Sequence, residues 1–291
     1  MEEATRKTQV LIEALPYILK FRDRYSVVKY GGSVLRENRF IRAVLQDLVF
    51  MSTVGMRVIL VHGGGSRISE TLAARGIKSE FVNGLRYTDS STIEIIREVL
   101  LEVNGEIRRT IEELGGRTAL LDPESRALKA VKLNRPGADL GLVGEISQVD
   151  KTFFEECGRN GTIPVVPPVA FGADGFLYNI NADTVASQIA TALQAEKLVF
   201  LSDQPGVMRN RDNAESLISI LRPSQARGLI EDGIITAGMI PKVQAALTAI
   251  SQGVRKVHLV AGHIPHALLL EIFTTQGTGT EIVPEDYQNG I

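Results

Sequence analysis

The chain contains one cysteine and no tryptophan, and the scarcity of cysteine limits what it can be. Cys157 has no partner in the chain, so an intrachain disulfide is excluded, and a reducing, cytoplasmic setting fits this composition. We interpret Cys157 as a structural residue. The four histidines lack zinc-type spacing and are also assigned structural roles, so no metal site is predicted.

Long apolar runs and an excess of one charge are missing as well. No stretch approaches the roughly 20 apolar residues that a spanning helix needs, and the N-terminal MEEATRK does not read as a signal peptide. The 32 Lys and Arg are balanced by 34 Asp and Glu, and the basic residues are scattered. We therefore predict a protein whose main ligand is neither nucleic acid nor a membrane.

Three common motifs are absent. Neither the Walker pattern GxxxxGK[ST] nor the dinucleotide fingerprint GxGxxG after a strand occurs, so any nucleotide is bound in another way. The GxSxG elbow is missing too, which argues against a serine hydrolase.

Two apolar strands that end in glycine turns are the strongest positive signal. The first strand, within residues 26–30, carries Lys29 near its end and is followed by Gly31 and Gly32. The second, residues 58–61, leads into three glycines at 63–65. Glycine turns can bring backbone N–H groups close to an anion, and the lysine adds a cation. This pattern predicts a phosphate site, on a βαβ unit whose helix spans residues 38–53.

Polar residues at the ends of later elements extend this site. Asn179, Asn181 and Asp183 cluster where a strand runs into a helix, and together they are predicted to orient a ligand or a lysine. Lys242 starts another predicted helix, where a cation opposes the helix dipole. An anion bound at this helix start would explain that placement.

Other segments indicate how the chain is arranged. Residues 8–21 form an amphipathic helix that Pro16 should kink or interrupt, and its apolar face covers either its own domain or another subunit. The sequence favours the first choice. A long helix to about residue 114 is predicted to start with a capping box of Ser91 and Glu94. Residues 117–150 are predicted to form a hairpin flap, and a second α/β stretch begins near residue 195.

Six segments, in this order, resemble the amino acid kinase family, and most closely its members that phosphorylate N-acetyl-L-glutamate: KYGGSVL, VHGGG, NGLRYTD, NINADTVA, LSDQPGV and GMIPKV. The resemblance covers residues 26–283. It implies a three-layer αβα sandwich around a mainly parallel sheet, with an acyl amino acid lobe at 26–194 and an ATP lobe at 195–291. The helix within residues 1–25 resembles that of the arginine-inhibited, hexameric branch.

The resemblance implies that the γ-phosphoryl group of ATP moves to the side-chain carboxylate of N-acetyl-L-glutamate. Lys29 and Lys242 are implied to neutralise the phosphoryl group while Asp183 holds both lysines, and Mg²⁺ arrives with the nucleotide. The other implied site residues are Gly32, Gly64, Gly65, Arg86 and Asn179 for the phosphoryl group and the acyl amino acid, and Asp203, Gly206, Gly238 and Met239 for ATP.

The branch also implies partners: L-arginine as an inhibitor, further copies of the chain in a dimer or hexamer, and a PII-type signalling protein. The sequence departs from the family pattern at two places. Gly105 and Glu106 follow Asn104 where many relatives have a lysine and an apolar residue. Residues 274–276 read Thr-Thr-Gln where arginine-sensitive relatives often carry an acidic residue.

Two alternative functions remain open. Another kinase of the family, acting on glutamate, aspartate, carbamate, uridylate or a carrier-linked aminoadipate, would share the lysines and glycine turns but differ around Arg86 and Asn179. A catalytically silent regulator that binds arginine or a protein partner would not need Lys29, Asp183 and Lys242 together.

Overall fold

The computed structural model describes residues 2–31, 38–125, 127–210, 213–235, 238–274 and 277–288. Within these residues an eight-stranded sheet runs in the order β12-β14-β13-β11-β1-β2-β8-β5, and its pairs are parallel except β13 with β14. Its strands are β1 (Tyr25–Tyr30), β2 (Arg57–His62), β5 (Thr118–Leu120), β8 (Ile163–Val166), β11 (Lys197–Ser202), β12 (Ile220–Leu221), β13 (Lys256–Ala261) and β14 (Thr280–Ile282).

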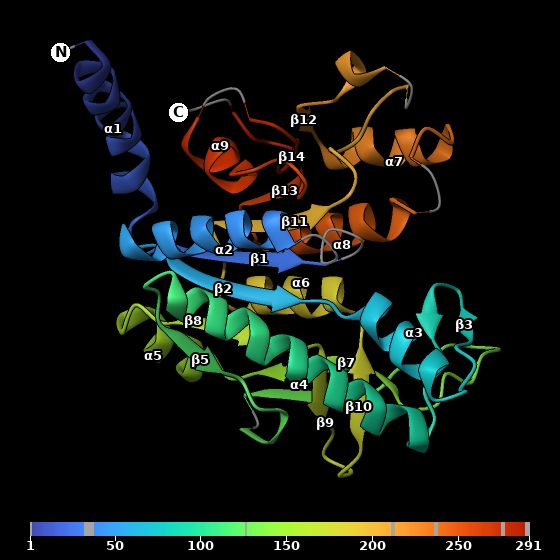
Figure 1. The fold of residues 1–291 in the computed structure, drawn as a ribbon. Coiled ribbons are helices and arrows are strands. Elements are labelled where there is room, and N and C mark those ends of the chain that lie inside the picture. The colour runs from blue at the N-terminus through green and yellow to red at the C-terminus, as the bar shows by residue number, and fades with distance from the viewer. Residues whose placement is uncertain are drawn as a thin grey trace.

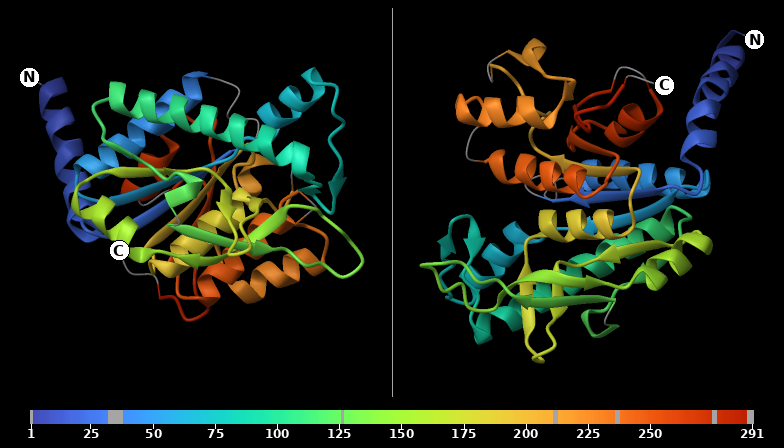
Figure 2. Two further views of the ribbon diagram at one scale, coloured as in Figure 1. Left: turned by 90° about the horizontal axis from the view of Figure 1, so that it is seen from below. Right: turned by 180° about the vertical axis from the view of Figure 1, so that it is seen from behind.

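Helices cover both faces of this sheet, as Figures 1 and 2 show. Successive side chains of a strand point to opposite faces, so Val28 packs in one core with α2, α4 and α9 while Val27 packs in another with α5, α6, α7 and α8. The predicted three-layer arrangement is confirmed. The helices are α2 (Asn38–Thr53), α3 (Gly65–Ala74), α4 (Ser90–Glu113), α5 (Lys151–Arg159), α6 (Ala182–Ala192), α7 (Pro223–Glu231), α8 (Ile240–Ser251) and α9 (Ala267–Phe273).

A smaller sheet lies beside the main one and contains the predicted hairpin flap, but the flap starts later in the chain than predicted. It has the order β6-β7-β10-β9, and β6 and β7 form the expected antiparallel pair. The flap does not begin at residue 117, however, because the short apolar strand β5 pairs with β8 in the main sheet. The remaining strands are β3 (Phe81–Val82), β4 (Leu85–Arg86), β6 (Leu128–Lys132), β7 (Val143–Val149), β9 (Val169–Phe171) and β10 (Leu177–Ile180).

Helix α1 (Glu2–Phe21) differs from its prediction in two ways. Pro16 does not interrupt it, because Pro16 and Ile12 lie on an exposed side where water can bind the carbonyl that proline leaves without a donor. The helix also projects from the body and contacts α9 near its C-terminal end (Figures 1 and 2). Its apolar face does not cover its own domain, since these side chains are exposed: Val10, Leu11, Ile12, Leu15 and Leu19.

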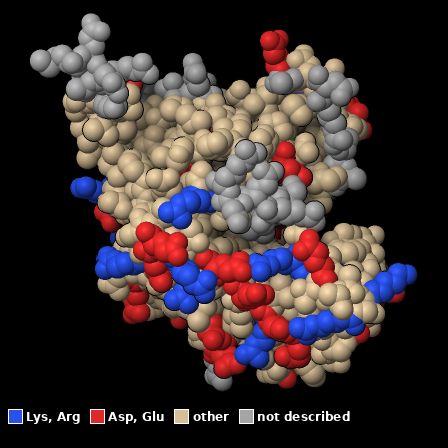
Figure 3. All heavy atoms as spheres, viewed as in Figure 1, with Lys and Arg blue, Asp and Glu red and all other residues tan. Residues whose placement is uncertain are grey.

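Helix α4 has a different N-cap from the predicted one. The Asp89 side chain accepts hydrogen bonds from the N–H groups of Ser91 and Thr92 at 3.1 and 2.7 Å, so the Ser91–Glu94 capping box was wrong. Positive and negative side chains are mixed on the face in Figure 3, over α3 and α4. Arg67 of α3 pairs with Glu106 of α4, Arg75 at the end of α3 pairs with Glu98 of α4, and Arg97 of α4 pairs with Glu124. No described helix is both long and apolar enough to cross a bilayer.

Candidate active site

Two lysines from distant parts of the chain meet one carboxylate. The ammonium of Lys29, near the end of β1, lies 2.9 Å from Oδ1 of Asp183, and Nζ of Lys242 lies 2.8 Å from Oδ2. Asp183 is in the first turn of α6 and Lys242 is in the first turn of α8. The parallel sheet therefore brings a strand end and two helix starts to one point.

Burial and charge together set the ionisation of this group. Burial opposes the charge of Asp183, but Lys29 and Lys242 outweigh it and hold the pKa of the carboxyl below its ordinary value. Burial lowers the pKa of Lys29 against the attraction of Asp183. One carboxylate between two ammonium groups leaves an excess of positive charge, which suits an anionic ligand.

The second glycine turn borders a cavity of about 230 Å³ beside these charges. A Cβ on Gly64 would stand 2.6 Å from Cδ2 of Leu100, and one on Gly31 would stand 2.8 Å from Nζ of Lys29. A side chain at Gly64 or Gly31 would thus displace the end of Leu100 or Lys29. Bare backbone at the start of α3 can approach an anion closely.

Arg86 lies on the other side of this cavity and is buried among neutral oxygens. Its guanidinium donates to the carbonyl of Gly65 at 3.0 Å, to Oγ of Ser69 at 2.8 Å and to Oγ of Ser79. Its Cζ lies 4.7 Å from the centre of the Phe81 ring. Burial lowers the pKa of Arg86. A buried guanidinium bonded to neutral acceptors is well placed to pair with a carboxylate.

The two asparagines near α6 have different roles. Asn179, on β10, donates from Nδ2 to Oγ1 of Thr88 at 3.2 Å. Oδ1 of Asn181 accepts from the N–H groups of Asp183 and Thr184 at 2.8 and 3.2 Å and so caps α6. Both residues line the cavity, but Asn181 also fixes the helix that carries Asp183.

A second cavity, of about 530 Å³, lies on the other side of Lys242. This volume is in the range of small-molecule sites. Its polar lining comes from the turn after β11, with Asp203 and Gln204, and from Lys242 in α8, while Val207, Ile234 and Ile235 add apolar surface. A Cβ on Gly206, whose φ is +142°, would stand 2.5 Å from Oγ1 of Thr280, so the turn requires glycine.

Every predicted site residue within the described ranges lines one of these two cavities. Gly32 lies outside the described residues. The first cavity is lined by Lys29, Gly64, Gly65, Arg86, Asn179 and Asp183, and the second by Asp203, Gly206, Gly238, Met239 and Lys242. No group of three or more His, Cys, Asp or Glu side chains in the described chain is arranged to hold a metal ion.

Sequence reasoning missed the residues that surround Arg86, although two signals pointed to them. Asn83 and Gly84 form a two-residue hairpin turn, a recognisable pattern that places Phe81 opposite Arg86. Ser69 lies one helical turn after Gly65, and its hydroxyl donates to the Gly65 carbonyl at 2.9 Å. The four-residue spacing places Gly65 and Ser69 on the same face of α3.

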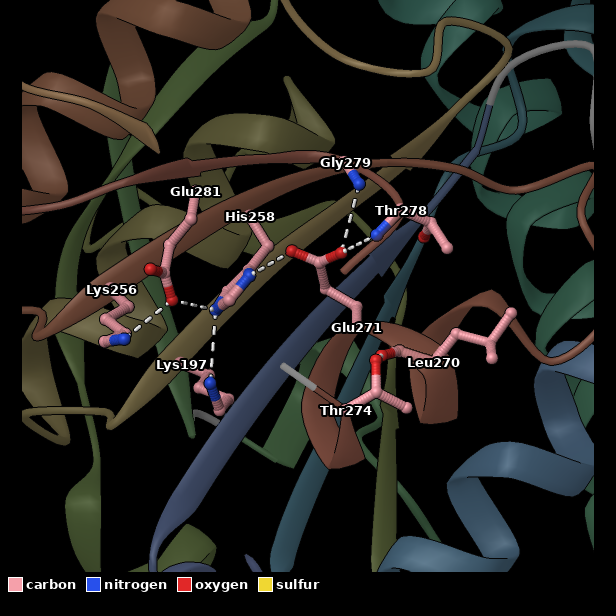
Figure 4. Close-up of polar contacts among 9 residues, drawn as sticks. All are labelled: Lys197, Lys256, His258, Leu270, Glu271, Thr274, Thr278, Gly279 and Glu281. Atoms are coloured by element: carbon pink, nitrogen blue, oxygen red, sulfur yellow. Dashed lines mark hydrogen bonds and ion pairs between the residues drawn. The ribbon is translucent and has the colours of Figure 1, made fainter. Parts of the chain in front are cut away.

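A separate polar cluster lies on β11, β13, β14 and α9 (Figure 4). Nδ1 of His258 lies 2.8 Å from Oε1 of Glu271, and Nε2 of His258 lies 3.3 Å from Nζ of Lys197. Lys256 pairs with Glu281 at 2.8 Å. We call Lys197, Lys256, His258, Glu271 and Glu281 the C-lobe cluster.

The C-lobe cluster joins the end of α1 to the loop before β14. Nζ of Lys197 lies 4.6 Å from the centre of the Phe21 ring, and burial lowers the pKa of this lysine to about 8. Glu271 accepts from the N–H groups of Thr278 and Gly279 at 2.6 and 3.1 Å. Burial opposes its ionisation, but His258 and these N–H groups prevail and lower the pKa of Glu271 to about 2.

Comparisons with known proteins agree with this geometry. The model of the amino acid kinase family matches residues 24–261. Acetylglutamate kinase from Syntrophomonas wolfei subsp. wolfei is 44% identical over 283 residues, which cover 97% of this chain and 99% of that protein.

Solved structures of N-acetylglutamate synthase from Neisseria gonorrhoeae are also similar. The complex with coenzyme A and N-acetyl-glutamate has a TM-score of 0.87 at 26% identity, over 96% of this chain and 64% of the synthase. The complex with coenzyme A and L-arginine has a TM-score of 0.82 at 26% identity, over 95% of this chain and 65% of the synthase.

Proposed function

Since this chain belongs to the amino acid kinase family, we propose that it transfers the γ-phosphoryl group of ATP to the side-chain carboxylate of N-acetyl-L-glutamate. The product is N-acetyl-L-glutamyl 5-phosphate, an intermediate of arginine biosynthesis. An acetylglutamate kinase that aligns along nearly the whole of both chains supports this substrate.

The observation that carries the proposal is the position of Asp183 between Lys29, which lines the first cavity, and Lys242, which lines the second. An acceptor in the first cavity and a nucleotide in the second would place the transferred group beside both cations. Two anions must approach each other for this reaction, so neutralising their charge lowers the barrier directly.

The reaction requires little covalent chemistry from the protein. A carboxylate is already ionised at pH 7, so no general base is needed, and its oxygen attacks the γ-phosphorus as ADP leaves. Lys29 and Lys242 stabilise the phosphoryl oxygens, and Asp183 keeps the two ammonium groups apart and in place. The N–H groups of Gly64 and Gly65 supply further donors.

Arg86 and Asn179 select the acceptor. The planar guanidinium of Arg86 binds the α-carboxylate of N-acetyl-L-glutamate, and the amide of Asn179 bonds the same molecule. Asp203, Gly206, Gly238 and Met239 border the nucleotide. Mg²⁺ enters with ATP and is held mostly by phosphate oxygens and water.

Removing either lysine tests this function. In Lys29→Ala or Lys242→Ala we expect kcat to fall by roughly 10²-fold or more, because the transition state loses a cation that it needs. The assay is ATP-dependent formation of the acyl phosphate, with circular dichroism showing that each variant is folded. Near-normal turnover in either variant would refute the assignment.

We also propose that L-arginine inhibits the enzyme through the C-lobe cluster. The cluster contains two carboxylates, Glu271 and Glu281, which a guanidinium can bind in exchange for their present partners, His258 and Lys256. Lys197 of this cluster lies against the Phe21 ring of α1, and Glu271 accepts hydrogen bonds from Thr278 and Gly279, which closely follow the residues 274–276 where the sequence departs from arginine-sensitive relatives. The complex of a similar synthase with L-arginine supports this proposal. Glu281→Gln should raise the arginine concentration needed for inhibition while leaving kcat without arginine unchanged.

The remaining proposals concern organisation. We assign residues 26–194 to an acyl amino acid lobe, residues 195–291 to an ATP lobe, and residues 1–25 to a regulatory helix through which copies of the chain assemble into a dimer or hexamer. The main sheet runs through both lobes, since β1 pairs with β11. A PII-type protein is a proposed partner, and the cytoplasm is the proposed location.

A further inference from the structure

His62, the last residue of β2, is a buried histidine that faces the glycine turn without belonging to the ion group. Its Nδ1 lies 3.0 Å from the carbonyl oxygen of Gly63, and its Nε2 lies 3.2 Å from Nδ2 of Asn104 on α4. Asn104 is also fully buried, and the same Nδ2 donates to the carbonyl of Val165 at 2.9 Å. A helix and a neighbouring strand thus fix one imidazole.

These partners select one state of the ring. The carbonyl of Val165 requires a donor, so the amide nitrogen of Asn104 faces it and also donates to Nε2 of His62. Nε2 is therefore the acceptor, and Nδ1 carries the proton that is donated to Gly63. Burial lowers the pKa of His62 to about 4, so the ring is neutral at pH 7.

The bond from His62 fixes the orientation of the peptide between Gly63 and Gly64. In a trans peptide the carbonyl and the following N–H point in opposite directions. Because the Gly63 carbonyl is held by the imidazole, the N–H of Gly64 points away from it. The N–H of Gly63 is bound to the carbonyl of Tyr30 at 2.8 Å, so Gly63 is held on both sides.

We propose that His62 and Asn104 are positioning residues that keep the Gly64 N–H aimed at the transferred phosphoryl group. Glycine lacks the side chain that would restrict its backbone, and the imidazole supplies that restriction. A turned peptide would instead present a carbonyl oxygen to an anion and replace attraction by repulsion. This inference rests on the proposed phosphoryl transfer.

Two substitutions of His62 separate positioning from packing. An asparagine amide can place its nitrogen near the position of Nδ1 and donate to Gly63, whereas a glutamine amide reaches toward Nε2 and Asn104 instead. We expect His62→Gln to lower kcat by at least about tenfold and His62→Asn by less than about threefold, with little change in the KM for ATP in either.

Thermal unfolding of both variants is the control for packing. A role in packing alone would destabilise both proteins while leaving their kcat values alike, and that result would overturn the proposal. So would a lower kcat in His62→Asn than in His62→Gln.

The ring state can be measured without any assay of activity. In ¹⁵N NMR spectra of the wild-type protein with labelled histidine, we expect His62 to be the neutral Nδ1–H tautomer at pH 7. In Asn104→Leu, which removes the donor to Nε2, we expect the Nε2 resonance to shift as that hydrogen bond is lost and kcat to fall. A wild-type ring that is protonated or carries its proton on Nε2 contradicts the proposal. Absence of phosphoryl transfer by the wild-type protein would instead contradict the proposed function.

Discussion

Arg86 shows how a single buried charge can define a substrate. The residues that surround its guanidinium offer a backbone carbonyl and two hydroxyl groups, which are weaker partners than a carboxylate. The Phe81 ring covers one side of the guanidinium and limits access of water. A carboxylate that enters this site gains a partner that is already desolvated and oriented.

Replacing Arg86 should therefore weaken acceptor binding selectively. In Arg86→Gln we expect the KM for N-acetyl-L-glutamate to rise by about 10- to 100-fold, since a charge-assisted hydrogen bond contributes about 1.5–3 kcal/mol. Initial-rate kinetics with each substrate varied will check this. The KM for ATP is the internal control, and an equal rise in both KM values would show that Arg86 does not select the acceptor.

Two glycines illustrate a second point about single residues. A Cβ at Gly31 meets the Lys29 ammonium, whereas a Cβ at Gly105, on α4, meets nothing within 4 Å. We expect Gly31→Ala to displace Lys29 and lower kcat by about tenfold or more. Gly105→Ala, the matched control, should leave kcat unchanged and stabilise the protein by about 0.5–1 kcal/mol. Urea denaturation and steady-state kinetics on both variants test this, and equal kcat values would contradict it.

Most helices and strands could be predicted because their sequence patterns are strong. The parallel pairing of β1 with β2 and the helix at 38–53 were both predicted correctly from apolar periodicity and glycine turns. The N-cap of α4 was not, because Asp89 and Ser91 are both good caps and sequence alone does not decide between them. Whether the helix continues through Pro16 depends on the exposure of that side of the helix to water, which the sequence does not give directly.

Helix α1 carries a prediction about assembly. Large apolar side chains are exposed along this helix, and contiguous exposed apolar surface is typical of an interaction site. We therefore expect the helix to pack against a second copy of the chain. Leu11→Asp with Leu15→Asp should lower the mass measured by multi-angle light scattering, because buried charges destabilise such an interface. Glu13→Ala on the same helix is the control. An unchanged mass in the double variant would contradict this role, and kcat without arginine should be normal in both.

For the whole molecule, the sequence identified the residues around both cavities, and the family resemblance implied that Asp183 holds Lys29 and Lys242. Six separated segments supplied the described site residues, and the parallel sheet with its flanking helices brought them to one edge. The C-lobe cluster was not predicted, because Lys197, His258 and Glu271 are far apart in the chain and each is unremarkable in its own segment. Buried networks of this kind depend on tertiary packing.

The C-lobe cluster should make the free energy of unfolding depend on pH in the acidic range. The pKa of Glu271 is about 2 in the folded protein and near 4.5 when unfolded, so its contribution is present above pH 4.5 and is lost as pH falls toward 2. This pKa difference contributes about 3 kcal/mol to the free energy of unfolding at neutral pH. In urea denaturation, the stability difference between the wild type and Glu271→Gln should shrink as pH falls from 7 to 3. A constant difference would show that Glu271 has no depressed pKa.

Acceptor specificity tests the central claim most directly. With Mg-ATP, hydroxylamine traps the acyl phosphate as a hydroxamate, and N-acetyl-L-glutamate is compared with free glutamate, aspartate and N-acetylaminoadipate, each with and without arginine. We expect hydroxamate from N-acetyl-L-glutamate at a rate far above the other acceptors. A faster reaction with another acceptor would identify a different kinase of the family, and no hydroxamate from any acceptor by a folded sample would contradict phosphoryl transfer to a carboxylate.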